Sequence, residues 1–166
     1  MTVSLSIQTK NKWHEQFPKR PYSSLPRPVV PLTEEFKPMT QISRHSHPWS
    51  QLAYSCSGVM HIETDDGTFV IPPEQALWIP PEMPHQHYCK NKVSYRSLHI
   101  DPLLSEVLGN KVRPLTVDSL LKSLILEISN WPKDYEETAQ TQRFILVLLD
   151  RLAMAQSNEL FMPTIK

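Results

Sequence analysis

The sequence has no net charge, only two cysteines and no long apolar segment. Each of these features argues against a class of protein. Seventeen basic side chains balance seventeen acidic ones, which argues against a strongly basic nucleic-acid-binding surface. The two cysteines, Cys56 and Cys89, are too few for a secreted disulfide framework and have no metal-type spacing. The longest apolar run, 144–149, is far shorter than the ~20 residues of a membrane span, and no signal peptide opens the chain. We expect a cytoplasmic protein with no membrane partner.

Glycine is scarce as well, with three residues against sixteen prolines. The prolines recur through the first 115 residues, so no long helix fits there. Between about 49 and 100, short alternating runs are separated by turn residues such as Asp65-Asp66-Gly67, a strong hairpin signal. Short strands at regular spacing predict a mainly β fold of the sandwich or barrel type.

After residue 114 the hydrophobic period changes to that of an α-helix. Apolar side chains from Val117 to Ile128 recur at helical spacing, and a second helix is expected from about 136 to 156. The second helix is apolar on nearly every face at its centre, which favours burial against both the β domain and a second copy of the chain. A plain core is the alternative for the same side chains. We predict a homodimer whose interface includes Phe144, Ile145, Leu148, Leu149 and Leu152.

One stretch stands out as a candidate site. It is His45-Ser46-His47-Pro48-Trp49-Ser50-Gln51, followed some thirty-five residues later by His85-Gln86-His87. Side chains two residues apart on a strand point to the same face, so each stretch directs its histidines to one side. If the two strands are neighbours, these imidazoles converge inside the fold. The pattern therefore predicts a metal site or a polar ligand pocket.

The spacing of these residues resembles the two metal-binding motifs of the cupin superfamily, over residues 45–58 and 80–85. The sequence departs from the motifs at Gln51, where the family has a glutamate, and at Glu82, where it usually has a glycine. Loss of the carboxylate weakens affinity for hard cations, while imidazole still suits zinc, nickel, iron or copper. The resemblance implies these ligands for a divalent transition metal: His45, His47, Gln51 and His85.

The residues that flank the motifs point to a narrower family. The stretches 45–54, 71–80 and 96–98 look like the N-terminal sensor domain of AraC-family transcriptional regulators. That resemblance implies a small cupin-like β-barrel (a jelly roll) that binds a small-molecule effector, followed by two dimerising α-helices. It also implies a C-terminal helix-turn-helix domain. Only ten residues follow Gln156, too few for such a domain, so DNA contact is expected through a domain not present here.

We therefore expect an effector-sensing and dimerisation domain of a transcriptional regulator, with no catalytic residue. Its parts are an N-terminal arm (1–26), the effector-binding barrel (27–113), the helical pair (114–156) and the start of a linker (157–166). The alternative is a small metal-dependent cupin enzyme of the dioxygenase, isomerase or decarboxylase type, with Glu82 as the nearest candidate acid.

Further side chains on the expected strands are candidates for contact with the effector, through stacking, hydrogen bonds or charge. For each of them a role in the core or on the surface is the alternative. These candidates are Trp49, Tyr54, His61, Trp78, His87, Arg96 and His99.

Overall fold

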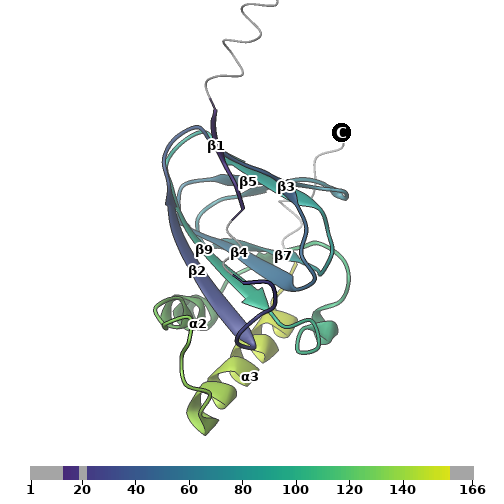
Figure 1. Ribbon diagram of the computed structural model, residues 1–166, viewed down its shortest axis with the longest axis vertical. Coiled ribbons are helices and arrows are strands. Elements are labelled where there is room, and N and C mark those ends of the chain that lie inside the picture. The colour runs from purple at the N-terminus through teal and green to yellow at the C-terminus, as the bar shows by residue number, and fades with distance from the viewer. Residues whose placement is uncertain (1–12, 19–21, 158–166) are drawn as a thin grey trace, which may run out of the picture.

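The fold consists of two β-sheets and two C-terminal helices (Figure 1), in a computed structural model that describes residues 13–18 and 22–157. The elements are β1 (His14–Gln16), β2 (Val29–Phe36), β3 (Thr40–His45), β4 (Ser50–Ser57), β5 (Met60–Thr64), β6 (Gly67–Ile71), β7 (Gln75–Ile79), β8 (His85–Cys89), β9 (Val93–Ile100), the 3-10 helix η1 (Glu106–Leu108), β10 (Arg113–Thr116), α2 (Ser119–Ser129) and α3 (Ala139–Met154).

The strands divide into two five-stranded sheets, with orders β1-β3-β8-β5-β6 and β10-β7-β4-β9-β2. The predicted mainly β fold followed by two helices is confirmed. The predicted closed barrel is corrected to a sandwich. Within the described residues each hydrogen-bonded ladder ends at an edge strand, β1 and β6 in one sheet and β10 and β2 in the other, so neither sheet closes on itself.

Two apolar cores lie on the two faces of the second sheet. The core between the sheets includes Ala53 of β4, while Leu52 and Tyr54 of the same strand belong to the core that packs against α2 and α3. This alternation follows from the two-residue period of a strand. Figure 1 shows both helices on the outer side of the sheet that contains β4 and β9. The inner face of that sheet is left for the site.

Both helices begin at side-chain caps. The Asp118 carboxylate accepts a hydrogen bond from the Leu121 backbone N–H at 2.8 Å, and Thr138 forms a capping box with Thr141. Helix α3 therefore begins at Ala139, three residues after the predicted start near 136. No described helix is both long enough and apolar enough to cross a bilayer.

The predicted arm contributes structure of its own. Strand β1 pairs in parallel with β3, so residues 14–16 form one edge of a sheet. The predicted boundary after residue 113 falls inside β10, which pairs with β7 and completes the other sheet. Residues 1–12 and 19–21 of the predicted arm, and residues 158–166 of the predicted linker, lie outside the described residues.

Gly58 ends the first motif for a steric reason. Its φ angle is +81°, and a Cβ atom there would lie 2.1 Å from the backbone oxygen of Lys92. Only glycine avoids both the strained angle and this contact. Glycine at this position thus allows the chain to turn from β4 into β5 close to the start of β9.

Candidate metal and ligand site

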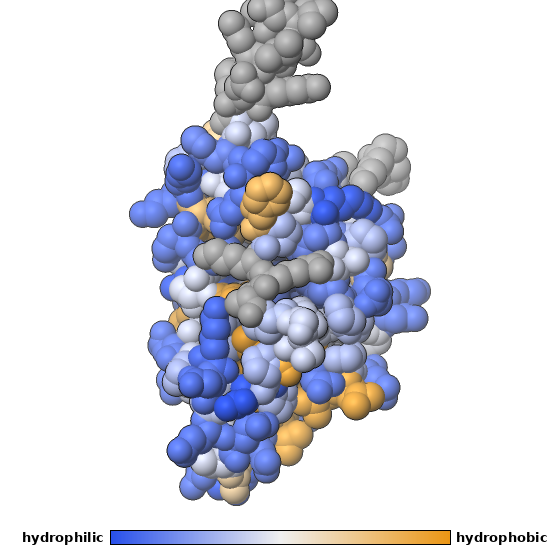
Figure 2. Space-filling view, in the orientation of Figure 1, coloured by the Kyte–Doolittle hydropathy of each residue, from blue (hydrophilic) through white to orange (hydrophobic). Residues whose placement is uncertain are grey.

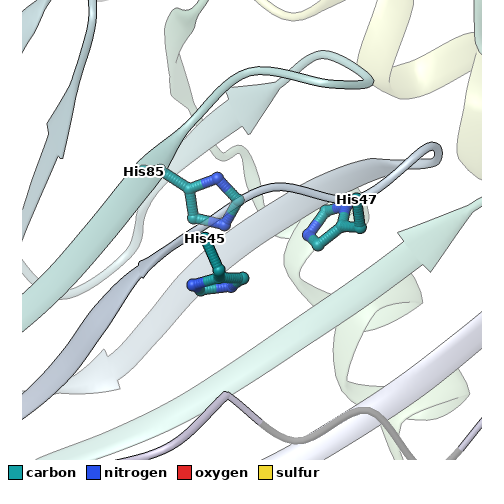
Figure 3. Close-up of side chains that lie close together, drawn as sticks. All are labelled: His45, His47 and His85. Atoms are coloured by element: carbon teal, nitrogen blue, oxygen red, sulfur yellow. The ribbon is translucent and has the colours of Figure 1, made fainter.

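Three histidines from different segments converge between the sheets. His45 ends β3, His47 lies in the loop before β4, and His85 begins β8. One ring nitrogen from each lies within 4.8 Å of the others, and Figure 3 shows the three rings side by side. The antiparallel register of β3 and β8 places His45 directly opposite His85. Sheet pairing thus joins two motifs that lie far apart in the sequence.

The hydrogen bonds of these three rings fix where their lone pairs point. The Nδ1 atoms of His45, His47 and His85 lie 2.8 Å from the backbone oxygens of Ser43, Trp49 and Met83. A carbonyl oxygen only accepts, so each Nδ1 carries a proton and donates it. In the neutral ring the lone pair then resides on Nε2. Such backbone bonds orient histidines for metal coordination.

Gln51 completes the set of potential metal ligands. Its Oε1 lies 2.9 Å from Nε2 of His47, and its Nε2 donates to the Tyr95 hydroxyl at 2.9 Å. With Nδ1 of His47 protonated, two lone pairs face each other across the first contact. A cation bound between these two atoms would relieve the repulsion between their lone pairs. With the amide turned end for end, its NH₂ group would donate to His47 and its oxygen would accept from Tyr95.

His45, His47, Gln51 and Tyr95 line a cavity that is partly open to solvent and has a free volume of about 40 Å³. Its walls come from both sheets, because β8 faces β4, β9 and β2 across the sandwich. The sheet register forms rows of inward side chains, with Gln51 opposite His99 and Tyr95 opposite Glu34. The lining residues are Pro18, Leu32, Glu34, Ile42, His45, His47, Gln51, His87, Tyr95, Ser97 and His99.

Burial keeps the histidines of this cavity neutral. Loss of hydration, followed by the effect of neighbouring imidazoles, lowers the pKa of His85 to about 3 and that of His99 to about 2. The same causes place the pKa of His87 well below its ordinary value. Burial also raises the pKa of Tyr95. At neutral pH these rings are therefore ready to bind a metal or to exchange hydrogen bonds with a neutral partner.

Glu82 holds the turn before His85 in an unusual conformation. Its φ angle is +67°, in the left-handed region that glycine favours, and it occupies the position where the cupin motif usually has glycine. Its backbone N–H donates to the His47 oxygen at 2.8 Å, which ties the turn to the loop that carries His47. The Glu82 side chain is exposed and does not line the cavity.

The arm covers the cavity at Tyr22. The Tyr22 hydroxyl lies 2.7 Å from Nδ1 of His99, and its ring packs against Trp49 with centroids 5.5 Å apart. Trp49 in turn stacks on His47, with ring planes 12° apart. Burial raises the pKa of Tyr22 to about 12. Pro18, from the same arm, lines the cavity directly.

Several predicted ligand-binding residues lie away from this cavity. Tyr54 and Trp78 point to the other face of their sheet and pack in the core beside α2 and α3, because they alternate with the inward side chains of β4 and β7. His61 stacks on Tyr88, with centroids 4.7 Å apart. Arg96 lies 3.8 Å from Glu35. His87, His99 and Trp49 are at or beside the cavity.

Most of the residues predicted for the dimer interface are buried within the chain itself. Ile145, Leu148, Leu149 and Leu152 belong to the core between α3 and the sheet, and Phe144 packs against that core. Different apolar side chains of the helices are exposed. These are Leu120 (46%), Leu146 (55%), Val147 (43%) and Met154 (67%).

Glu34 is a cavity residue that the sequence prediction missed. Among the described lining residues it is the one carboxylic acid side chain. The sequence could have indicated this position, because Glu34 alternates along β2 with the apolar residues Leu32 and Phe36, which are both buried. An acidic residue on the apolar face of a strand indicates a polar group turned inward.

Comparison with known proteins settles the family. The model of the AraC-like ligand binding domain matches residues 32–160. The chain belongs to this family. The HTH-type transcriptional regulator NimR of Escherichia coli (strain K12) is 25% identical to this AraC-like domain over 119 residues. The match covers 72% of the domain and 43% of NimR, so the domain spans less than half of that relative.

Two solved structures of ToxT show the same fold. ToxT from Vibrio cholerae matches the AraC-like domain with a TM-score of 0.56 and 6% identity, over 77% of this chain and 57% of ToxT. Unsaturated fatty acid bound ToxT matches with a TM-score of 0.55 and 9% identity, over 76% and 52% of the two chains. A cupin superfamily protein from Desulfitobacterium hafniense matches 44% of this chain and 77% of its own, with a TM-score of 0.40 and 17% identity.

Proposed function

We propose that this domain senses a small effector in the histidine-lined cavity and thereby controls DNA binding by an attached helix-turn-helix domain. The observation that carries this proposal is the histidine-lined cavity between the sheets, with Tyr22 of the arm hydrogen-bonded to His99 in its wall. NimR, a relative, is an HTH-type regulator, and ToxT, with the same fold, has been seen with a fatty acid bound. Such a regulator works in the cytoplasm, where it meets DNA.

The arm is the element that an effector would reach first. It contributes Pro18 to the lining and Tyr22 to the contacts with His99 and Trp49. A ligand that prefers one position of the arm shifts the population toward that position. Because β1 pairs with the strand that ends at His45, the arm is joined to both sides of the cavity. We infer that these contacts differ between the ligand-bound and ligand-free states, as allosteric control requires.

A divalent transition metal at His45, His47, Gln51 and His85 is part of the proposal. The three protonated Nδ1 atoms leave Nε2 lone pairs to coordinate it, and the buried Nε2 of His85 has no hydrogen-bond partner in the described structure. Imidazole and amide ligands suit zinc, nickel, iron or copper. When bound, the ion would supply a Lewis-acidic centre next to the effector cavity. The enzyme alternative gains no support from Glu82, which is exposed.

The test of the sensing role measures DNA affinity. Compounds that raise the melting temperature of the domain are added to a longer protein that carries it in front of a helix-turn-helix domain. At least one is expected to change DNA affinity in a mobility-shift assay by about 5- to 150-fold. Leu32→Phe, which narrows the cavity, serves as the control and is expected to lose that response. If every stabilising compound leaves DNA affinity unchanged, the domain is not a sensor.

We also propose that the domain dimerises through the exposed apolar residues of its helices. Figure 2 shows apolar surface gathered toward the helical end of the visible face. Val147→Glu is expected to convert a dimer into a folded monomer in sedimentation experiments, because it places a charge in a desolvated interface. Gln140→Glu, at an exposed position of α3, adds the same charge and is expected to leave the dimer intact. A Val147→Glu protein that still dimerises would place the interface elsewhere.

A further inference from the structure

We propose that the cavity binds the carboxylate group of a small effector, with one carboxylate oxygen at the metal ion and the other accepting a hydrogen bond from His87. This inference rests on the proposed function, since it names the chemistry of the effector and uses the proposed metal site. It gives His87 a role of its own, because this residue is not one of the three clustered histidines.

His87 has hydrogen-bonding capacity that the protein leaves unused. It lies on β8 and is only 2% exposed, and neither of its ring nitrogens has a hydrogen-bond partner in the described structure. A buried polar atom without a partner is costly, so such an atom usually meets a ligand or an ordered water molecule. Because no hydrogen bond within the described residues fixes its tautomer, the neutral ring can donate from either nitrogen. His87 is therefore able to donate to an acceptor in the cavity.

His87 lies beside the clustered histidines and faces the same cavity. Its ring centroid is 5.4 Å from that of His85 and 6.3 Å from that of His45. It lines the cavity together with His45 and His47, but it does not belong to the group whose ring nitrogens approach within 4.8 Å. His87 is thus placed to contact a ligand of the ion and not the ion itself.

The charge of the site favours an anionic ligand. Three neutral imidazoles and the Gln51 amide leave both positive charges of a divalent ion without compensation from its protein ligands. Glu34 is the one carboxylic acid among the described lining residues, and it already has an interaction within the protein. Even an uncompensated Glu34 would offset only one of the two charges. Because buried net charge is costly, the site stabilises a monoanion.

A carboxylate matches both partners. It has two acceptor oxygens, so one can meet the ion while the other accepts from the His87 N–H. A hydrogen bond to an ionised group is roughly twice as strong as one between neutral groups. Zinc sites also accept carboxylate oxygen beside imidazole nitrogen. An amide of the same shape carries no charge and has a single acceptor oxygen, so it fits only one of the two partners.

The size of the cavity limits the rest of the ligand. Its free volume of about 40 Å³ accommodates about three water molecules. A carboxylate with one or two carbon atoms is close to that size. The cavity is partly open to solvent, so any longer part of the effector is expected to lie toward the opening. Acetate is therefore the simplest probe of the site.

Acetate and acetamide are matched probes, because they share one shape and differ in charge. Each is titrated into protein loaded with cobalt(II), whose visible absorption changes when a ligand joins the ion. Acetate is expected to bind with a dissociation constant of about 1–10 mM, as suits a ligand of four heavy atoms. Acetamide is expected to bind at least about tenfold more weakly. In metal-free protein, followed through the NMR signals of the His87 ring, acetate is expected to lose at least about tenfold in affinity.

Substitutions assign the effect to His87. His87→Phe is expected to weaken acetate binding by about 10- to 100-fold with cobalt content unchanged, because the lost interaction is a hydrogen bond to a charged group. His87→Gln keeps a donor and is expected to restore most of the affinity. His61→Phe makes the same change on β5, where the ring stacks on Tyr88 away from the cavity, and is expected to leave acetate binding unchanged.

Acetate that binds His87→Phe as tightly as wild type would overturn the inference, and so would equal binding to metal-free protein. If circular dichroism shows that His87→Phe does not fold, the wild-type His87 ring decides, since acetate must shift its NMR signals in zinc-loaded protein. Protein that takes up no cobalt would refute the metal site and this inference together.

The sensing role is judged separately, by DNA affinity. Selective acetate binding without any effector response in the mobility-shift assay would keep the ligand preference and remove the sensing role. A metal-loaded protein that responds to an uncharged effector and ignores acetate would do the reverse.

Discussion

Lowering the pH from 7 to 5 is expected to reduce the free energy of unfolding of the metal-free domain by about 6 kcal/mol, arising from His85, His87 and His99. Each has a folded-state pKa far below the ordinary value of 6.5, with His85 at about 3 and His99 at about 2. The cause is burial in a cavity where a charged ring loses its hydration and meets other imidazoles.

The sign follows from the protons that each state binds. Well above pH 6.5 these rings are neutral in both states and contribute no pH dependence. Below it the unfolded chain takes up protons that the folded chain excludes, so stability falls with pH until the folded-state pKa values are reached. Each ring contributes about 2 kcal/mol between pH 7 and pH 5. That loss is large against the total stability of a typical domain.

Urea denaturation at a series of pH values, with a chelator present, measures this dependence. In His87→Phe one of the three titrating rings is absent, so the slope of the free energy of unfolding against pH is expected to fall by about a third. A free energy of unfolding that is level between pH 7 and pH 5 would contradict the prediction. It would mean that protonated rings are accommodated inside the sandwich.

Substituting His85 with alanine is expected to eliminate bound transition metal, the second large effect. Elemental analysis of protein purified without a metal-affinity tag is expected to find one such ion per wild-type chain and none in His85→Ala. Titration with zinc is expected to show at least about a hundredfold weaker binding, since even supporting residues of metal sites contribute 10- to 100-fold. Loading the wild type to a thousand times its dissociation constant is expected to add about 4 kcal/mol of stability.

His61→Ala is the matched control, because it removes a histidine that stacks on Tyr88 away from the cavity. It is expected to leave metal content unchanged. Gln51→Glu restores the carboxylate of the cupin motif and is expected to tighten binding by reducing the net positive charge of the site. Wild-type protein that takes up no metal even when loaded, or His85→Ala protein that retains it, would refute the proposed ligand set.

The sequence was most informative where strand period and motif spacing acted together. Gln51 faces one side of β4 and Leu52 and Tyr54 the other, as the two-residue period of a strand dictates. Motif spacing predicted that the histidines of two distant segments meet, and the pairing of His45 with His85 brings them together. These properties are local, or depend on one pair of strands.

Properties that depend on the packing of whole layers were harder to predict. An apolar helix centre does not say whether its faces meet a sheet or a partner, so Leu148 was assigned to an interface although it is fully buried in the chain. Trp78 was assigned to the ligand for its aromatic ring, although its face meets the helices. The parallel pairing of β1 with β3 could not be predicted, because residues 14–16 show no alternation of apolar and polar side chains. Alternation with Leu32 and Phe36 indicates that Glu34 points inward, but its place in the cavity depends on the pairing of β2 with β9.

The two faces of β4 bring the histidine-lined cavity and the core under the helices close together. Gln51 touches the histidine site and the adjacent Leu52 belongs to the core under the helices. Only one peptide group separates the two side chains, and the core on the helix side of β4 is closely packed. Under the proposed sensing role, a ligand that shifts Gln51 would displace this core across the thickness of a single sheet.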